Sequence, residues 1–166
     1  MTDKKSITLV LLPGLDGTGL LFEPLLAALP SSIRTQVVAY PPDQSLSLAE
    51  YAARVRKQLP QGDVVLLAES FSGLVALSLL VEWVAAIKAV IFVAAFAEPP
   101  RPYLLRFAPL IPHAGSVLRS APAFLLRQFC LGRSASALQL AAVRRALAVV
   151  TPEVLGSRLS LVAARR

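Results

Sequence analysis

Ser70 stands at a position in this 166-residue chain where its hydroxyl could act as a nucleophile. It falls between a short apolar run, Val64 to Ala68, and a helix-like apolar segment, Leu74 to Val84. A sharp strand-to-helix turn at Ser70 would expose the hydroxyl and direct the next backbone N–H groups toward it. Such a turn needs small neighbours, because the chain passes close to itself there. The flanking residues are small: Ala68, Ser72 and Gly73. A nucleophile is therefore favoured over the alternative of a helix N-cap serine.

A glycine-rich loop upstream could supply further backbone N–H groups. Residues 13–19 read Pro-Gly-Leu-Asp-Gly-Thr-Gly and follow Ser6–Leu12, an apolar run typical of a strand covered on both faces. A helix is predicted next, over Leu20–Leu29. The glycine spacing does not match the dinucleotide fingerprint, and the loop has no lysine for a nucleotide triphosphate, so a phosphate site is not favoured.

The predicted elements place both features at one edge of a sheet. Further strands are predicted over Thr35–Tyr40 and Lys88–Ala94, and a helix over Leu48–Leu59 begins with a capping box of Ser47 and Glu50. This alternating order implies an α/β protein with a parallel sheet of about four strands and right-handed crossovers. Ligands of such sheets bind beyond the carboxyl ends of the strands, where the glycine loop and the candidate serine both fall.

The composition changes after residue 100. Residues 1–100 carry 7 Lys or Arg and 9 Asp or Glu, a net charge of −2, whereas residues 101–166 carry 10 Arg and one acid, a net charge of +9. We therefore divide the chain into a core, residues 1–100, and an arginine-rich helical segment, residues 101–166. Short helices are predicted in the second part over Tyr103–Leu110, Gly115–Ser120, Ala123–Leu131 and Ala135–Val149. Solvated arginine faces on these helices are preferred to an anionic partner, and neither nucleic acid nor a membrane is an expected partner.

Composition also bounds the class of protein. Hydrophobic residues make up 55% and charged residues 16% of the chain, as in a globular protein with a substantial core. Glu82 and Lys88 interrupt the apolar stretch 74–97, which fits buried elements better than a membrane span. The single cysteine, Cys130, excludes an internal disulfide and a cysteine-based metal site. We expect a cytoplasmic protein, with no cofactor or metal implied.

Two segments together resemble the α/β-hydrolase superfamily. They are residues 11–19, Leu-Leu-Pro-Gly-Leu-Asp-Gly-Thr-Gly, and residues 66–73, Leu-Leu-Ala-Glu-Ser-Phe-Ser-Gly. More narrowly, the pair is similar to small bacterial serine hydrolases of the esterase type. The resemblance covers about residues 6–100 well, and the remainder loosely, as a C-terminal helical lid.

The resemblance implies roles for residues of both segments. Ser70 would be the catalytic nucleophile, and the backbone N–H groups of Phe71 and Leu15 would form the oxyanion hole. Gly14 and Asp16 would line the substrate site, although Asp16 is also a good turn residue. The chain departs from the family where alanine and serine replace the glycines more usual at positions −2 and +2 from the nucleophile.

A base for the serine is harder to find. In this superfamily the acid and the histidine follow the nucleophile in chain order. The one histidine, His113, lies in lid sequence without a preceding strand, so a surface or substrate-facing role is preferred to that of the base. Glu98 follows the fourth predicted strand and is a second acid/base candidate. Glu69 is expected to point away from Ser70 and to support the adjoining strand or helix.

The sequence thus looks like roughly the first two-thirds of a serine hydrolase. Three explanations stay open: a shortened product or fragment of an esterase, a complete enzyme whose base is His113 or comes from a partner chain, or a fold that binds a ligand or protein without catalysis. We predict hydrolysis of a carboxylic ester or thioester with an apolar acyl group, because the lid is rich in aromatic residues. These are Tyr103, Phe107, Phe124 and Phe129. The incomplete sheet would expose its fourth strand, which predicts a homodimer through that edge or coverage by the lid.

Overall fold

The fold is built on a four-stranded parallel sheet. The computed structural model describes residues 7–82, 84–95, 113–132 and 134–164. The strand order is β2-β1-β3-β4, and each neighbouring pair is parallel, which confirms the predicted α/β class. The strands are Thr8–Leu12 (β1), Arg34–Val37 (β2), Val64–Glu69 (β3) and Ile87–Val93 (β4).

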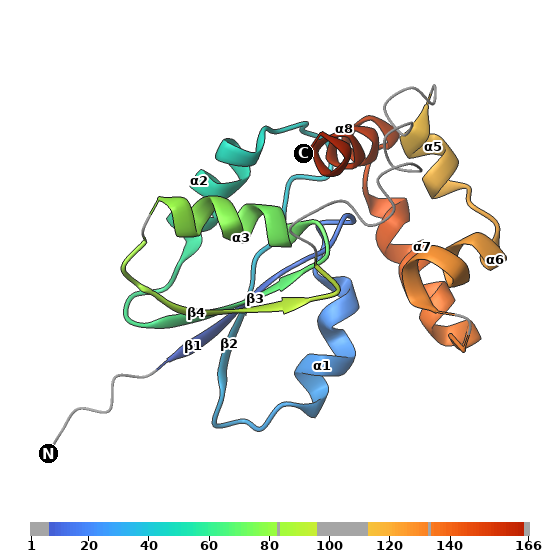
Figure 1. The fold of residues 1–166 in the computed structure, drawn as a ribbon. Helices are drawn as coiled ribbons and strands as arrows, with labels where there is room; N and C mark the ends of the chain where they lie inside the picture. The colour runs from blue at the N-terminus through green and yellow to red at the C-terminus, as the bar shows by residue number, and fades with distance from the viewer. Residues whose placement is uncertain (1–6, 83, 96–112, 133, 165–166) are drawn as a thin grey trace, which may run out of the picture.

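Helices cover both faces of this sheet. α2 (Leu48–Gln58) and α3 (Ser72–Val81) lie on one face (Figure 1). α1 (Glu23–Ala28), preceded by the 3₁₀ turn η1 (Leu20–Phe22), lies on the other (Figure 1). α2 begins with the predicted capping box, in which the Ser47 side chain accepts from the Glu50 N–H and the Glu50 carboxylate accepts from the Ser47 N–H.

The central strands are apolar because they are buried on both faces. In β1, Val10 and Leu12 belong to the main core, whereas Leu11 lies in a second cluster on the opposite face. The main core also contains buried residues of α2 and α3, and the second contains Phe22 beside α1. This double burial explains why the sequence of β1 lacks the polar alternation of a half-exposed strand.

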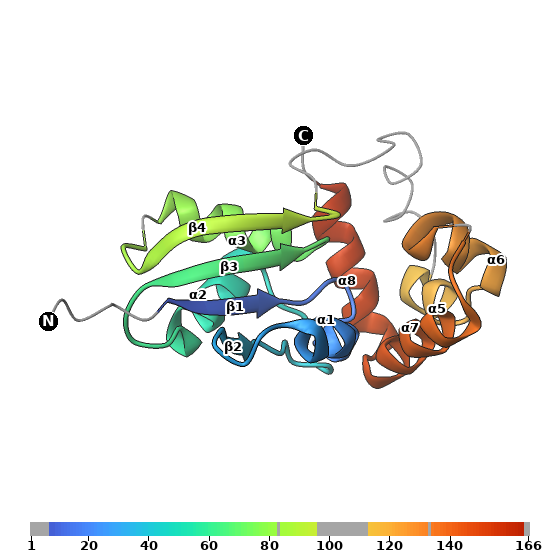
Figure 2. The same cartoon turned by 90° about the horizontal axis from the view of Figure 1, so that it is seen from below.

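A helical segment follows the sheet at the carboxyl ends of its strands. Figure 2 shows β1, β3 and β4 pointing toward α8, with α5, α6 and α7 beyond it. The bounds are Ala114–Arg119 (α5), Ala123–Leu126 (α6), Arg127–Leu131 (the π-helical turn η3), Ala137–Val149 (α7) and Pro152–Ala163 (α8). The predicted helix over 103–110 lies outside the described residues.

The sequence analysis missed helix α8. Its start carries the usual signals, since the Thr151 side chain caps the N–H of Val154, Pro152 occupies the first turn and Glu153 follows. α8 joins two cores: Leu155 packs in the cluster of the helical segment, whereas Val162 packs in the main core against the sheet. The boundary predicted at residue 100 lies outside the described residues and stays a prediction.

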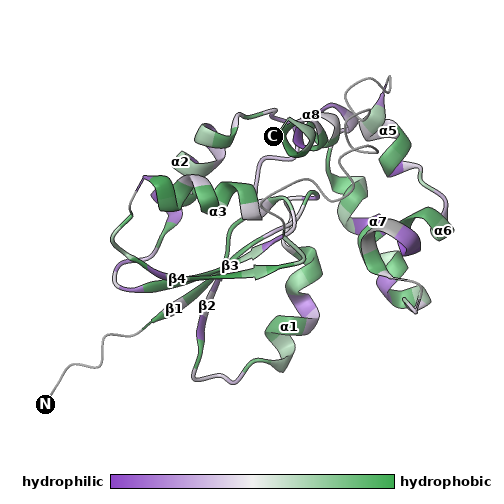
Figure 3. Ribbon diagram, viewed as in Figure 1, coloured by the Kyte–Doolittle hydropathy of each residue, from purple (hydrophilic) through white to green (hydrophobic). Residues whose placement is uncertain are grey.

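The most hydrophobic elements are internal to this fold or at the edge of its sheet. Figure 3 shows α3 and β4 mainly in the hydrophobic colour. Within the described ranges, no individual helix combines the length and the hydrophobicity needed to cross a membrane, and α7 and α8 meet those criteria only as a pair bent by 105°.

Candidate active site

Ser70 forms a tight corner between β3 and α3. Its backbone is left-handed, with φ 48°, which is uncommon for a residue other than glycine. The N–H of Ser70 donates to the Val93 carbonyl of β4 at 3.0 Å, and its carbonyl accepts from the Gly73 N–H at 3.0 Å. The predicted strand-to-helix turn is therefore present. The N-cap alternative is wrong, because Phe71 occupies the N-cap position of α3 and no side chain caps that helix.

The small neighbours of Ser70 are required by close packing. A Cβ at the Gly73 position would lie 2.8 Å from the Cβ of Ala95, beyond the end of β4. Ala68 and Ser72 are both fully buried. A side chain at Gly73 would push the corner away from the end of β4, and a larger one at Ala68 or Ser72 would disturb the buried packing around them.

Ser72 has a role that the sequence analysis did not find. Its hydroxyl donates to the Pro13 carbonyl at the start of the glycine loop and lies 2.6 Å from the hydroxyl of Tyr40. The sequence analysis considered Ser72 for its size alone. The only sequence signal was a hydroxyl at a position where the family more often has glycine.

The glycine loop lies directly against the corner. A Cβ at Gly14 would be 3.6 Å from the Cβ of Ser70, so the two backbones are in close contact. The loop turns tightly, since the Gly17 N–H donates to the Gly14 carbonyl at 3.1 Å and the Gly17 carbonyl accepts from the Tyr40 N–H at 2.8 Å. Gly17 has φ 71°, a conformation that favours glycine.

Two backbone N–H groups, one in the glycine loop and one at the start of α3, have no acceptor within the described ranges. In a trans peptide the N–H points opposite to the preceding carbonyl, so the bond from Gly17 to the Gly14 carbonyl turns the Leu15 N–H outward from the loop. Phe71 stands at the N-terminus of α3, where backbone N–H groups have no partner within the helix. Among the described residues, no hydrogen-bond acceptor is found for the N–H of Leu15 or of Phe71.

Two carboxyl groups flank the glycine loop. The Asp16 carboxylate is buried and accepts from both the N–H and the hydroxyl of Thr18, which supports its alternative role in the turn. The Glu69 carboxyl packs against Gly14, with its Cδ 3.5 Å from where a Cβ would stand, so it contacts the glycine loop. Burial raises the pKa of Glu69 above its ordinary value, the charge of Asp16 raises it further, and a hydrogen bond from the Gly14 N–H opposes the shift.

Similar solved structures identify the fold. One describes recognition and ring cleavage of the Pseudomonas quinolone signal, with TM-score 0.75, 20% identity, and coverage of 97% of this chain and 63% of the other. A carboxylesterase structure from the thaumarchaeon Nitrososphaera gargenis has TM-score 0.71 and 12% identity, covering 98% and 65%. The type II thioesterase BorB of the borrelidin cluster has TM-score 0.60 and 22% identity, covering 98% and 67%. The chain has the α/β-hydrolase fold.

The likeness shows the fold and not the reaction. The chain spans less than two-thirds of the length of the first two of these structures, at 63% and 65%. No family model matches the sequence. The search of curated proteins found no match either.

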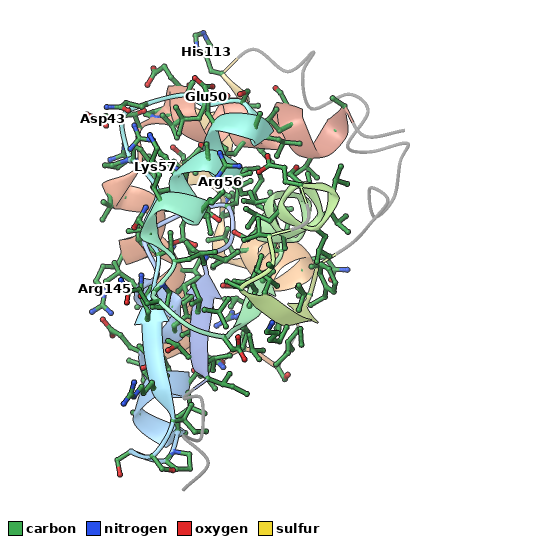
Figure 4. The ribbon with its side chains drawn as sticks, turned by 90° about the vertical axis from the view of Figure 1, so that its left-hand side faces the viewer. Asp43, Glu50, Arg56, Lys57, His113 and Arg145 are labelled. Carbon is green, nitrogen blue, oxygen red and sulfur yellow. The ribbon has the colours of Figure 1, made fainter. Side chains whose placement is uncertain are left out.

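The acid and base of an α/β-hydrolase are not brought to Ser70 by the described residues. His113, the one histidine of the sequence, is exposed at the start of α5, and Figure 4 shows its side chain pointing away from the rest of the molecule. This supports the surface interpretation of His113. Glu98 lies outside the described residues. Within those residues, no group of three or more His, Cys, Asp or Glu side chains could hold a metal ion.

The aromatic residues of the helical segment are only partly described. Phe124 is 67% exposed on α6. Tyr103 and Phe107 lie outside the described residues, and the described side chains do not include that of Phe129. The apolar lid therefore stays a prediction.

Arg158 of α8 is an exception to the predicted solvated arginine faces. It is fully buried, whereas Arg145 of α7 is exposed and pairs with Glu23 at 3.1 Å. The sequence analysis missed Arg158 because a single arginine among apolar residues gives no sign of the side to which its guanidinium turns.

Proposed function

We propose that this chain carries the nucleophile and the oxyanion hole of a serine hydrolase. The observation that supports this most directly is the left-handed corner at Ser70, together with the N–H groups of Leu15 and Phe71, which have no acceptor in the described part of the chain. A strained corner of this kind is costly, and it persists in proteins mainly where function needs it.

The chemistry follows from that geometry. The Ser70 hydroxyl oxygen attacks the acyl carbon of the substrate, and the carbonyl oxygen takes up negative charge. The N–H groups of Leu15 and Phe71 then stabilise that oxyanion, an effect typically worth about 100- to 1000-fold in rate for one donor. The alcohol or thiol leaves, and water releases the acyl group from Ser70. A base that accepts the Ser70 proton comes, in this proposal, from outside the described residues or from a second chain.

We propose carboxylic esters or thioesters with apolar acyl groups as the substrates. The carboxylesterase and thioesterase structures with the same fold support this class. The large exposed apolar side chains of the helical segment, Phe124 and Leu138, also support an apolar acyl group.

A fluorophosphonate probe tests the proposal. We expect the folded chain to be labelled at Ser70 and Ser70→Ala to be unlabelled. Ser78→Ala is the matched control, because Ser78 of α3 donates only to the Leu74 carbonyl of its own helix, and this variant should be labelled like the unchanged chain. A folded chain that gives no label would refute the hydrolase proposal for this chain.

The outward position of His113 favours one alternative, a fold that binds an acyl ligand or a protein without catalysis. Thermal shifts with fatty acids of increasing length discriminate the two. A non-catalytic binder would be stabilised equally with and without the Ser70 hydroxyl and would remain unlabelled by the probe.

A further inference from the structure

The buried guanidinium of Arg158 is bonded to the glycine loop. Its Nη1 donates to the carbonyls of Leu15 and Asp16, both at 2.8 Å. Its Nη2 donates to the Pro41 carbonyl at 2.9 Å, and its Nε donates to the Tyr51 hydroxyl at 2.9 Å. One side chain from α8 thus reaches the glycine loop, the chain after β2, and α2.

These partners are unusual for a buried cation. All four are neutral, and within the described residues Arg158 makes no ion pair. The rings of Tyr40 and Tyr51 each lie 5.6 Å from its Cζ and offset part of the cost of desolvation. Burying a charge without a counter-charge is expensive, so its position calls for a function beyond filling the core.

The bonds of Arg158 fix the conformation of the loop that holds the oxyanion donor. The carbonyls of four successive residues, 14 to 17, all accept hydrogen bonds. The Gly14 carbonyl accepts from the Gly17 N–H, and the Gly17 carbonyl accepts from the Tyr40 N–H. The two carbonyls between them, of Leu15 and Asp16, accept from Arg158. Because each carbonyl fixes its peptide plane, the direction of the Leu15 N–H is fixed as well. The planar guanidinium suits this task, since its rigid fork holds the two loop carbonyls from Nη1 while Nη2 and Nε are fixed by Pro41 and Tyr51.

Gly17 shows how closely the two elements fit. A Cβ at this position would lie 2.8 Å from the Cζ of Arg158. The loop therefore has no room for a side chain where it rests on the guanidinium.

We infer that Arg158 is a positioning residue for the oxyanion hole, holding the loop so that the Leu15 N–H faces the oxyanion. This rests on the proposed function. Because α8 packs in both the main core and the core of the helical segment, the same contact joins the helical segment to the reaction centre.

The test uses Arg158→Lys, which keeps the charge but loses the planar fork, and Arg158→Met, which loses both. The first measurement is hydrogen exchange of the backbone amides in residues 14–19. We expect exchange at least about tenfold faster in both variants, with β1 and β3 unchanged, because a loop that loses its hydrogen bonds opens locally.

The second measurement is the limiting rate of labelling by the fluorophosphonate probe. We expect Arg158→Lys to lower that rate by about tenfold or more while the half-saturating probe concentration stays within twofold, because an oxyanion donor acts on the transition state.

Gly17→Ala tests the inference with Arg158 in place. It should displace the guanidinium and give the same faster exchange and slower labelling. Gly132→Ala is its control, because Gly132 also has a positive φ, 88°, but nothing lies within 4 Å of its Cβ position. Leu67→Ala controls for a general loss of stability, since Leu67 is buried in the second cluster, to which Leu15 of the loop does not belong.

The outcomes separate the two proposals. If the unchanged chain is not labelled, the hydrolase proposal fails, and loop exchange alone decides whether Arg158 holds the loop. If the amide exchange of residues 14–19 in the Arg158 and Gly17 variants stays within twofold of the unchanged chain, Arg158 does not position the loop. A labelled chain whose limiting rate is unaffected by Arg158→Lys also overturns the inference.

Discussion

The Tyr40 hydroxyl donates to the Ser72 hydroxyl at 2.6 Å, and Ser72 donates in turn to the Pro13 carbonyl. The direction follows because Ser72 has one hydroxyl hydrogen and the carbonyl can only accept. Burial raises the pKa of Tyr40, which keeps it protonated as the donor. This buried chain of bonds connects the end of β2, the glycine loop and the corner that holds Ser70.

We expect Ser72→Ala to lower the free energy of unfolding by about 1–3 kcal/mol, because it leaves the Tyr40 hydroxyl buried without an acceptor. Tyr40→Phe should lower the free energy of unfolding by less than Ser72→Ala does, since Ser72 keeps its hydrogen bond to the Pro13 carbonyl. The double variant should lose less unfolding free energy than the two single variants lose together, by a coupling of about 0.5–3 kcal/mol. The reason is that it no longer contains the buried Tyr40 hydroxyl without an acceptor. Urea unfolding of the four proteins measures this cycle, and additive effects would show that the bond contributes nothing.

We expect Ser70→Gly to be more stable than Ser70→Ala. A left-handed conformation destabilises an ordinary residue by about 1–2 kcal/mol, which favours glycine. The greater freedom of glycine in the unfolded chain opposes this and lowers the stability of the glycine variant by about 0.4–1 kcal/mol. The expected difference in unfolding free energy is therefore about 0.5–1 kcal/mol. Both variants lack the Ser70 hydroxyl, so thermal unfolding compares the backbone strain of the corner with the unfolded-state freedom of glycine. Ser70→Gly would be the less stable variant, by about 0.4–1 kcal/mol, if the corner were unstrained.

The strand-to-helix corner and the parallel sheet were predictable from the sequence because local patterns determine them. The apolar runs at 64–68 and 74–84, with small residues between them, allow few other structures. The capping box of Ser47 and Glu50 was predictable for the same reason, since both residues lie within one helical turn.

The connections between distant segments could not be predicted. Arg158 bonds to residues more than 100 positions away, and nothing in its neighbours signals that its guanidinium turns inward. The same holds for Tyr40 and Ser72, and for the contact of Glu69 with Gly14. Helix α8 itself was predictable from Thr151 and Pro152, but its place across both cores depends on packing that the sequence pattern does not record.

We expect Glu69→Gln to change how stability depends on pH. Because the pKa of Glu69 is raised in the folded state, the stabilisation from its proton is fully present below its ordinary value of 4.5 and is lost as pH rises through the folded pKa. Glutamine keeps the shape and an acceptor for the Gly14 N–H without the charge. The variant should gain stability relative to the unchanged chain between acidic and neutral pH.

Glu50→Gln is the control of opposite sign. Hydrogen bonds from Ser47 hold the pKa of Glu50 below its ordinary value, so its stabilisation is present above that value and is lost as pH falls through the folded pKa. Glu50→Gln should therefore lose stability at neutral pH, and the loss should disappear in acid. Urea unfolding at both pH values measures the two variants, and the same sign in both would contradict the assigned causes.

We expect the chain to associate through β4. Within the described residues, β4 pairs only with β3, and its Ile91, Phe92 and Val93 are 47%, 46% and 41% exposed. An edge strand with free backbone groups and exposed apolar side chains pairs readily with another strand, and a second copy of β4 is such a strand.

Sedimentation velocity should show a concentration-dependent dimer. Ile91→Lys should shift it to monomer, because a charge on the edge opposes pairing. Val149→Lys, on a similarly exposed residue of α7, should leave the dimer intact. A chain that stays monomeric at every concentration would instead indicate that β4 is covered within one molecule.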